Sequence, residues 1–410
     1  MKLGENKVNK KNIIALSSVP LIMTLGNSML IPVLPEIEKK LSITSFQVSL
    51  IITVYSVVAI LCIPIAGYLS DRIGRKKVLL PCLLIAGLGG AVAAVASTIM
   101  KEPYMWILLG RVLQGIGSAG AAPVVMPFIG DLFHDDEEVS AGLGAIETSN
   151  TAGKVLSPII GAFLASWVWF MPFWFIPFFS LISFLMVMFM VESAKKEHKS
   201  PVFKEFVKST KAIFKHEGRW LYAIFAIGGF IMFLLFGVLF YLSDNLEAVY
   251  QIKGVKKGLL LSIPLLFLSI SSYIAGKTIG KEKWKMRIFL IAGMALLSLS
   301  YVLLWWNHSF YLLFICLSIG GVGIGIVLPA LDALITEGIE KEQRGTITSF
   351  YSSMRFIGVA LGPPIYAYLM DKGDSIVFIL STICSLISLF LVLFFIQPDE
   401  KDESEKLKTV

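Results

Sequence analysis

The stretch Gly67-Tyr68-Leu69-Ser70-Asp71-Arg72-Ile73-Gly74-Arg75-Lys76-Lys77 decides the fold of this chain, because it joins two long apolar runs. The runs cover roughly residues 46–69 and 78–98, and each is long enough to cross a bilayer as a helix. Between them stand four cations and one carboxylate, too few residues for a domain. The pattern predicts a tight cytoplasmic turn between two membrane-spanning helices, since cations accumulate in cytoplasmic loops.

The composition extends this prediction to the whole chain. Of 410 residues, 56% are hydrophobic and only 16% are charged, with a mean hydropathy of +0.78. Soluble domains carry about 25% charged residues, so most of this chain must face lipid or packed helices. We expect an all-α membrane protein with twelve transmembrane helices, because the apolar runs have helical length and no short alternating segments indicate a barrel. The runs start near Ile13, Phe46, Val78, Tyr104, Val139, Met171, Trp220, Gly258, Ile288, Phe310, Thr346 and Ser375.

The distribution of cations predicts the orientation. The net charge is +7, and most of the 36 Lys and Arg residues fall in segments that lie on one side if the N-terminus is cytoplasmic. Both termini are therefore expected in the cytoplasm, and the excess charge does not indicate a nucleic-acid partner. An external loop with Lys253, Lys256 and Lys257 is an exception to this bias. The four cysteines fall inside apolar runs, so neither a disulfide framework nor a metal site is expected.

The chain divides into two similar halves. We expect a six-helix bundle over 1–191, a cytoplasmic linker with an amphipathic helix over 192–219, a second six-helix bundle over 220–396 and a disordered tail over 397–410. Leu328-Pro329-Ala330-Leu331-Asp332 corresponds to Met126-Pro127-Phe128-Ile129-Gly130-Asp131, and Gly362-Pro363 corresponds to Ser157-Pro158. Such a repeat predicts a substrate site at the membrane midplane between two bundles.

Three segments carry a resemblance to a known family. The stretch from Gly67 to Lys77 resembles the loop signature of the major facilitator superfamily, and Leu109-Gly110-Arg111-Val112-Leu113-Gln114-Gly115 resembles its motif in the fourth span. Gly153-Lys154-Val155-Leu156-Ser157-Pro158-Ile159-Ile160-Gly161-Ala162 resembles the fifth-span motif of its exporters, although Ser157 and Ala162 replace glycines. The resemblance covers the whole chain and implies two pseudo-symmetric six-helix bundles, with the drug:proton antiporters as the nearest group.

The resemblance also implies roles for two sets of residues. It assigns proton coupling to Arg111, whose charge within a span marks a pathway or a paired site. It assigns gating to a charge cluster at the first turn. A glycine in this turn can adopt a positive φ. Asp131 is expected to join the charge cluster. The expected gating residues are Gly67, Asp71, Arg72, Gly74, Arg75 and Asp131.

A polar face is expected on the fifth span. Glu147, Asn150, Thr151 and Lys154 have helical spacing, so their side chains share one side of the helix and should face a cavity rather than lipid. Glu147 is a candidate proton carrier. Lys154 either binds an anionic group of the substrate or neutralises a carboxylate, and we favour the second role.

The remaining candidates extend these sites. Asp332 and Arg355 fall on neighbouring spans, where they are expected either to form a structural ion pair or to take part in proton coupling. Arg355 is also expected to line the substrate cavity. Asn27 and Gln114 are expected to line the substrate cavity, and Gln114 is also a candidate for a hydrogen-bond network with Arg111. Small residues and prolines in the fifth and eleventh spans predict close helix packing. The packing residues are Gly153, Pro158, Gly161, Gly362 and Pro363.

The function expected from these patterns is secondary active transport. The resemblance implies export of amphipathic, drug-like compounds by alternating access, driven by the proton gradient and without a bound cofactor or metal. Siderophore or lipid export, proton-linked uptake of a small nutrient, and a transport-inactive membrane sensor are the alternatives. We expect a monomer in a bacterial-type cell membrane whose partners are a small molecule, protons and lipid. No nucleophile and base are arranged as in an enzyme.

Overall fold

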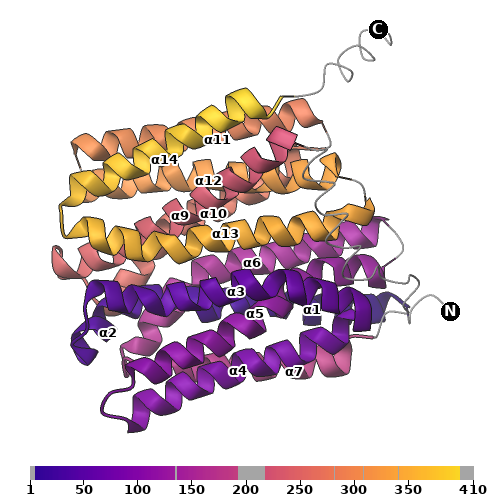
Figure 1. The fold of residues 1–410 in the computed structure, drawn as a ribbon, viewed down its shortest axis with the longest axis horizontal. Coiled ribbons are helices and arrows are strands. Elements are labelled where there is room, and N and C mark those ends of the chain that lie inside the picture. The colour runs from indigo at the N-terminus through magenta and orange to yellow at the C-terminus, as the bar shows by residue number, and fades with distance from the viewer. Residues whose placement is uncertain are drawn as a thin grey trace.

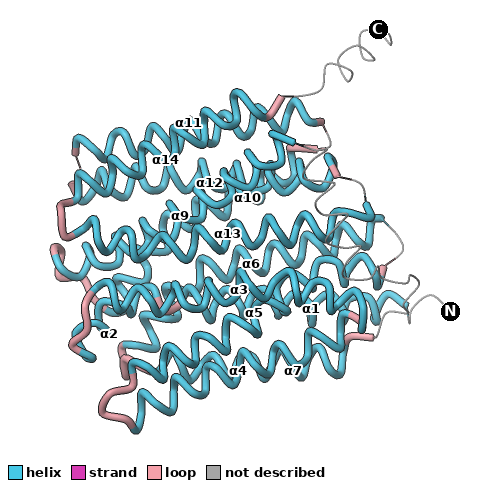
Figure 2. Tube along the Cα trace, viewed as in Figure 1, coloured by secondary structure: helices cyan, strands magenta, loops and turns pink. Residues whose placement is uncertain are grey.

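The computed structural model describes residues 5–133, 136–192, 218–280, 282–307, 309–339 and 341–397, and these residues form helices joined by short turns. Figures 1 and 2 show long helices running side by side, with loops only at their two ends. Lipid offers backbone groups no hydrogen-bond partners, so apolar segments of this length must satisfy their own N–H and C=O groups as helices. The first half comprises α1 (Glu5–Ser28), α3 (Ser45–Ile73), α4 (Arg75–Ile99), α5 (Tyr104–Leu132), α6 (Asp136–Ala165) and α7 (Met171–Met190). The second half comprises α9 (Gly218–Ala248), α10 (Gly254–Thr278), α11 (Lys283–Trp306), α12 (Phe310–Gly338), α13 (Lys341–Met370) and α14 (Asp374–Phe395).

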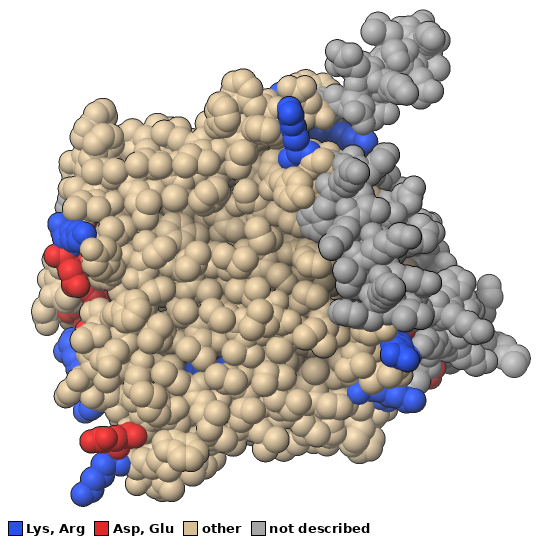
Figure 3. Space-filling view, viewed as in Figure 1, with Lys and Arg blue, Asp and Glu red and all other residues tan. Residues whose placement is uncertain are grey.

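The helix count agrees with the expected twelve spans. Ten helical segments in the described part of the chain are long and apolar enough to cross a membrane, and α6 and α13 complete the set. The visible charged side chains gather at the two ends of the helices, and the band between them is almost free of charge (Figure 3). A band of this kind fits the hydrocarbon region of a bilayer.

The two halves meet along two helix pairs. α3 of the first half packs against α13 of the second, and α6 packs against α10. In Figure 1 the first half, coloured from indigo to magenta, lies below the orange and yellow helices of the second half. α6 and α13 are the two long helices that fall short of the hydropathy of a lipid-facing span. Their place between the halves explains this, because charged side chains there are shielded from lipid.

The first span is shorter than expected and is followed by an additional helix. The sequence suggests one apolar run to Pro35, but α1 ends at Ser28 and the chain continues through a 3₁₀ turn, η1 (Ile31–Val33), into α2 (Leu34–Leu41). Pro32 and Pro35 explain the break, because proline lacks an N–H and favours the first turn of a new helix. α2 lies at the end of the molecule opposite to the start of α1, and this end is called the α2 end below (Figure 1).

The described residues are interrupted between the two halves. α7 ends at Met190 and α9 begins at Gly218. The amphipathic helix expected in the linker and the tail beyond residue 397 lie outside the described residues.

Candidate functional site

A cavity of about 220 Å³ lies between the two halves. Its wall is built by α1, α3, α5 and α6 from the first half and by α9, α10 and α13 from the second. Most of the wall is apolar or aromatic, which suits a ligand with an apolar body. The hydrogen-bonding and charged side chains on it include Thr24, Asn27, Tyr55, Ser118, Asn150, Lys154, Thr348, Ser352 and Arg355.

Arg111 of α5 lies behind this wall, fully buried, and joins three helices. Its Nε donates to the carbonyl of Ile51 on α3 at 2.7 Å, and its Nη2 donates to Oδ1 of Asn27 on α1 at 2.5 Å. Nη1 donates to Oε1 of Gln114, and the guanidinium lies 4.4 Å from the centroid of the Tyr55 ring. Gln114 therefore belongs to the Arg111 network and not to the cavity wall. Two residues that Arg111 contacts, Asn27 and Tyr55, line the cavity.

The four polar side chains on this face of α6 form two groups: two line the cavity, and two contact each other along the helix. Asn150 and Lys154 line the cavity, and Oδ1 of Asn150 accepts a hydrogen bond of 2.7 Å from Thr24 of α1. Thr151 donates to the backbone carbonyl of Glu147 at 2.7 Å and lies 3.3 Å from its carboxylate. Glu147 and Thr151 are not part of the cavity wall. The shared face is as the spacing indicates, but only half of its side chains reach the cavity.

Asp332 of α12 and Arg355 of α13 lie next to each other. The distance between Nη1 of Arg355 and Oδ1 of Asp332 is 3.8 Å, so the ion pair that their neighbouring spans suggest is present. Arg355 lines the cavity, whereas Asp332 does not. Asp332, Glu147 and Lys154 also interact electrostatically, which makes one charged cluster from both halves.

Arg75 is the centre of the charge cluster at the first turn. It pairs with Asp71, four residues earlier near the end of α3, and its Nε lies 2.9 Å from Oδ2 of Asp131 at the end of α5. Gly74 has a φ of 106°, the positive value expected for the turn glycine. Gly67 lies where α3 meets α13, because a Cβ there would be 3.2 Å from Oγ of Ser349. Arg72 is exposed at the end of α3.

The small residues of α6 and α13 allow close contact between helices. A Cβ on Gly161 would collide with the backbone of Met29, the residue after α1, and a Cβ on Gly153 would lie 3.1 Å from Thr24. Gly362 approaches α9 in the same way, since a Cβ there would lie 2.8 Å from the carbonyl oxygen of Phe233. Pro158 and Pro363 lie within α6 and α13, and Pro158 also lines the cavity.

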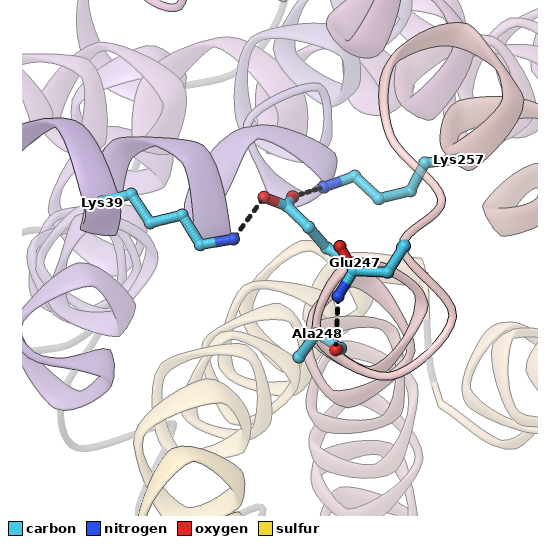
Figure 4. Close-up of polar contacts among 5 residues, drawn as sticks. Lys39, Glu247, Ala248 and Lys257 are labelled. Carbon is cyan, nitrogen blue, oxygen red and sulfur yellow. Dashed lines mark hydrogen bonds and ion pairs between the residues drawn. The ribbon is translucent and has the colours of Figure 1, made fainter.

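One cluster was not predicted from the sequence. Glu247 near the end of α9 accepts hydrogen bonds of 2.7 Å from Lys39 of α2 and from Lys257 of α10 (Figure 4). These three residues are called the clasp below. Lys257, expected in an external loop, is instead a buried residue of α10 whose side chain is 3% exposed. The signal in the sequence is a lysine next to an apolar run, which suggests a counter-ion for Lys257. The sequence does not identify that counter-ion.

The clasp closes the α2 end of the molecule between the halves. Lys39 belongs to the first half, whereas Glu247 and Lys257 belong to the second. Nearby, Oγ of Ser243 on α9 donates to the carbonyl of Ile31 in η1 at 3.0 Å, again across the two halves. Both contacts lie on the α2 side of the cavity, so that side is closed in this conformation.

Comparisons with known proteins agree with this architecture. The family pattern of the Major Facilitator Superfamily matches residues 16–286 and 246–409. A protein of Bacillus subtilis (strain 168) named bacillibactin exporter is 73% identical over 401 residues, which cover 98% of this chain and 100% of that protein. The class C tetracycline resistance protein of Escherichia coli is 26% identical over 376 residues, 88% of this chain and 89% of the relative. The crystal structure of a D-xylose–proton symporter has the same fold, with a TM-score of 0.78 at 12% identity over 95% of this chain and 98% of that one. The chain therefore belongs to the Major Facilitator Superfamily and is a multi-pass transporter of the bacterial cell membrane.

Proposed function

We propose that this transporter exports bacillibactin or a closely related siderophore by alternating access, coupled to proton entry. The observation that carries this proposal is the 73% identity to a bacillibactin exporter, which extends over the full length of that relative. Of the substrate classes that the sequence leaves open, siderophore export is thus favoured over export of general drug-like compounds.

The geometry supports an inward-facing conformation for this proposal. The clasp closes the α2 end, while the side chain of Asp332, near the opposite end of α12, is 46% exposed. Cations are plentiful in the turn at Gly74 and scarce between α4 and α5, so we place the end opposite to α2, where α1 starts and α14 ends, in the cytoplasm. The cavity then receives substrate from the cytoplasm and releases it when the clasp opens.

Proton coupling is assigned to the carboxylates beside the cavity. Glu147 and Asp332 are close enough to Lys154 and Arg355 for their charge to change the electrostatics of the wall. Protonation of either carboxylate would leave the cations less compensated, and this can change which conformation is favoured.

The test is secretion by whole cells. A Bacillus subtilis strain that lacks its bacillibactin exporter is transformed with this chain, and bacillibactin in the medium is measured by mass spectrometry under iron limitation. We expect secretion to return to the level of the parent strain, and to fall when a protonophore removes the gradient. Secretion no higher than with an empty vector contradicts the proposal. Tetracycline and ethidium accumulation in the same cells measures whether the export is restricted to the siderophore.

A further inference from the structure

The wall of the cavity carries cations without a carboxylate. Among the described residues that line it, Lys154 and Arg355 bear full charges, and no Asp or Glu is present. The rest of the wall is mainly apolar, with residues such as Met23, Met232 and Phe236. A molecule inside the cavity therefore meets a positive polar region within an apolar surface.

The two cations come from opposite halves of the protein. Lys154 lies on α6 and Arg355 on α13, the two long helices that fall below the hydropathy of the other spans. They interact electrostatically with each other across the cavity. Two like charges held near one cavity are unfavourable unless an anion or nearby carboxylates compensate them.

The nearby carboxylates compensate the charge but do not use all of the donors. Oδ1 of Asp332 lies 3.8 Å from Arg355, which is beyond hydrogen-bond distance. Glu147 lies about two turns before Lys154 on the same helix and contacts Thr151. Both carboxylates lie outside the wall, so the side of each cation that faces the cavity remains available to a ligand.

The uncommitted polar groups at this place are donors. Within the part of the chain that the structure describes, no hydrogen bond or ion pair involves the ammonium group of Lys154. Oδ1 of Asn150 accepts from Thr24, and its amide N–H groups are donors that can point to a ligand. Arg355 offers up to five N–H groups in a planar fork that matches a carboxylate, sulfonate or phosphate.

We infer that Lys154 and Arg355 form an anion-binding site shared by the two halves, and that the transported molecule is an organic anion with an apolar body. This inference rests on the proposed function, because it takes the cavity to be the place where the exported molecule binds. Neutral and cationic compounds fit the apolar wall but gain nothing from the two cations. The site therefore selects substrate by charge.

The experiment uses two dyes that differ by one anionic group. The full-length protein in phosphatidylcholine nanodiscs is titrated with 8-anilino-1-naphthalenesulfonate and with N-phenyl-1-naphthylamine, which lacks the sulfonate. Fluorescence of empty nanodiscs is subtracted. We expect the sulfonate to bind at least about tenfold more tightly, since hydrogen bonds to charged groups are the strong ones.

Matched variants show whether these two residues cause the difference. Lys154→Gln and the double variant Arg355→Gln/Asp332→Asn should each weaken binding of the sulfonate about tenfold or more and leave the neutral dye unchanged. Lys154→Arg should retain binding, and Lys101→Gln, an exposed residue between α4 and α5, is the control for general charge. Equal affinity for the two dyes in the wild type would overturn the inference. Equal loss of both dyes in the variants would also overturn it, because the side chains would then act on cavity shape.

The same variants separate this inference from the proposed function. Suppose that cells carrying the wild-type protein do not secrete bacillibactin, but the purified protein discriminates between the dyes through Lys154 and Arg355. The anion site then stands and the named substrate is wrong. If bacillibactin is secreted but the dyes are not discriminated, the export function stands and the anion site is wrong.

Discussion

Lys39 of α2 and Glu247 of α9 form an ion pair of 2.7 Å across the two halves of the protein, although the two residues are 208 positions apart. The side chain of Lys39 is 60% exposed, whereas that of Glu247 is 6% exposed. Lys257 provides the second, buried partner of the same carboxylate. Alternating access requires contacts between the halves at this end to break, whereas the bond between Glu247 and Lys257 lies within the second half. The exposure of the two lysines makes the Lys39 pair the easier one to break. Water competes with Glu247 for the exposed Lys39 but does not reach the buried Lys257.

The clasp leads to a prediction about stability. Glu247→Gln leaves Lys257 buried without a counter-ion, so we expect the free energy of unfolding in detergent to fall by about 3–5 kcal/mol. Lys39→Gln removes the exposed partner and should change it by less than about 1 kcal/mol. Thermal unfolding followed by tryptophan fluorescence measures both.

A double variant provides the control for this prediction. Glu247→Gln/Lys257→Met removes the buried carboxylate and the buried cation together, and most of the lost stability should return. Equal destabilisation by Lys39→Gln and Glu247→Gln would show that burial of Lys257 does not determine the effect.

Arg111 should not be replaceable by lysine. The guanidinium donates to α1, to α3 and to its own helix, whereas an ammonium group cannot reach three separated acceptors. We expect Arg111→Lys to reduce siderophore export strongly and to destabilise the protein by about 1–3 kcal/mol, because buried acceptors lose their donors. Export and thermal unfolding are measured on the same preparation.

Arg219 provides the matched substitution, since it is exposed at the start of α9. Arg219→Lys is expected to leave both quantities unchanged. Full activity of Arg111→Lys would mean that charge alone matters at this position and that the hydrogen bonds do not.

Gly74 should be sensitive to the addition of a single methyl group. Its φ of 106° and ψ of 142° are unfavourable for any residue with a Cβ, although no atom would obstruct that Cβ within 4 Å. Gly74→Ala should therefore destabilise the protein by about 1–3 kcal/mol through the backbone alone. The measurement is the shift of the thermal unfolding midpoint.

Gly144 of α6 gives the comparison, because it too has open space around the position of a Cβ but lies within a helix. Gly144→Ala should be neutral or stabilising by up to about 1 kcal/mol, as alanine favours helix. If the two substitutions had the same effect, strain at the turn would not be its cause.

Proton movement should depend on the carboxylates beside the cavity. We expect the addition of bacillibactin to release protons from the purified wild-type protein in weakly buffered solution. Asp332→Asn or Glu147→Gln should reduce this release, because an amide cannot exchange a proton. A pH-sensitive dye measures the release. Glu102→Gln, at an exposed position between α4 and α5, should release as much as the wild type. Release that is unchanged in both test variants would exclude these two residues as the coupling sites.

Much of the architecture could be predicted because it depends on local chemistry. Twelve spans follow from apolar length, and the turn glycine at Gly74 follows from its place between two helices. The pair of Asp332 with Arg355 could also be anticipated, because both are charges within neighbouring spans that lipid would penalise. The break after Ser28 was missed, since an apolar run does not report where proline ends one helix and begins the next.

The candidate site could be predicted only as a set of residues, not as an arrangement. Helical spacing indicates a shared face for Glu147 and Lys154, yet it cannot tell that Lys154 reaches the cavity and Glu147 does not. Gln114 is expected at the cavity from the sequence but contacts Arg111 behind the wall. Such distinctions depend on how each helix is rotated against its neighbours.

The amino-acid sequence by itself determined that this protein spans a membrane with paired helical bundles, because burial in lipid is a matter of length and apolarity along the chain. Only the tertiary structure decided which charges meet. Lys39, Glu247 and Lys257 come together at the α2 end, and Lys154 and Arg355 come together at the cavity, because the two halves pack along α3 with α13 and α6 with α10. Contacts between residues so far apart in the chain depend on that packing and leave no local signal in the sequence.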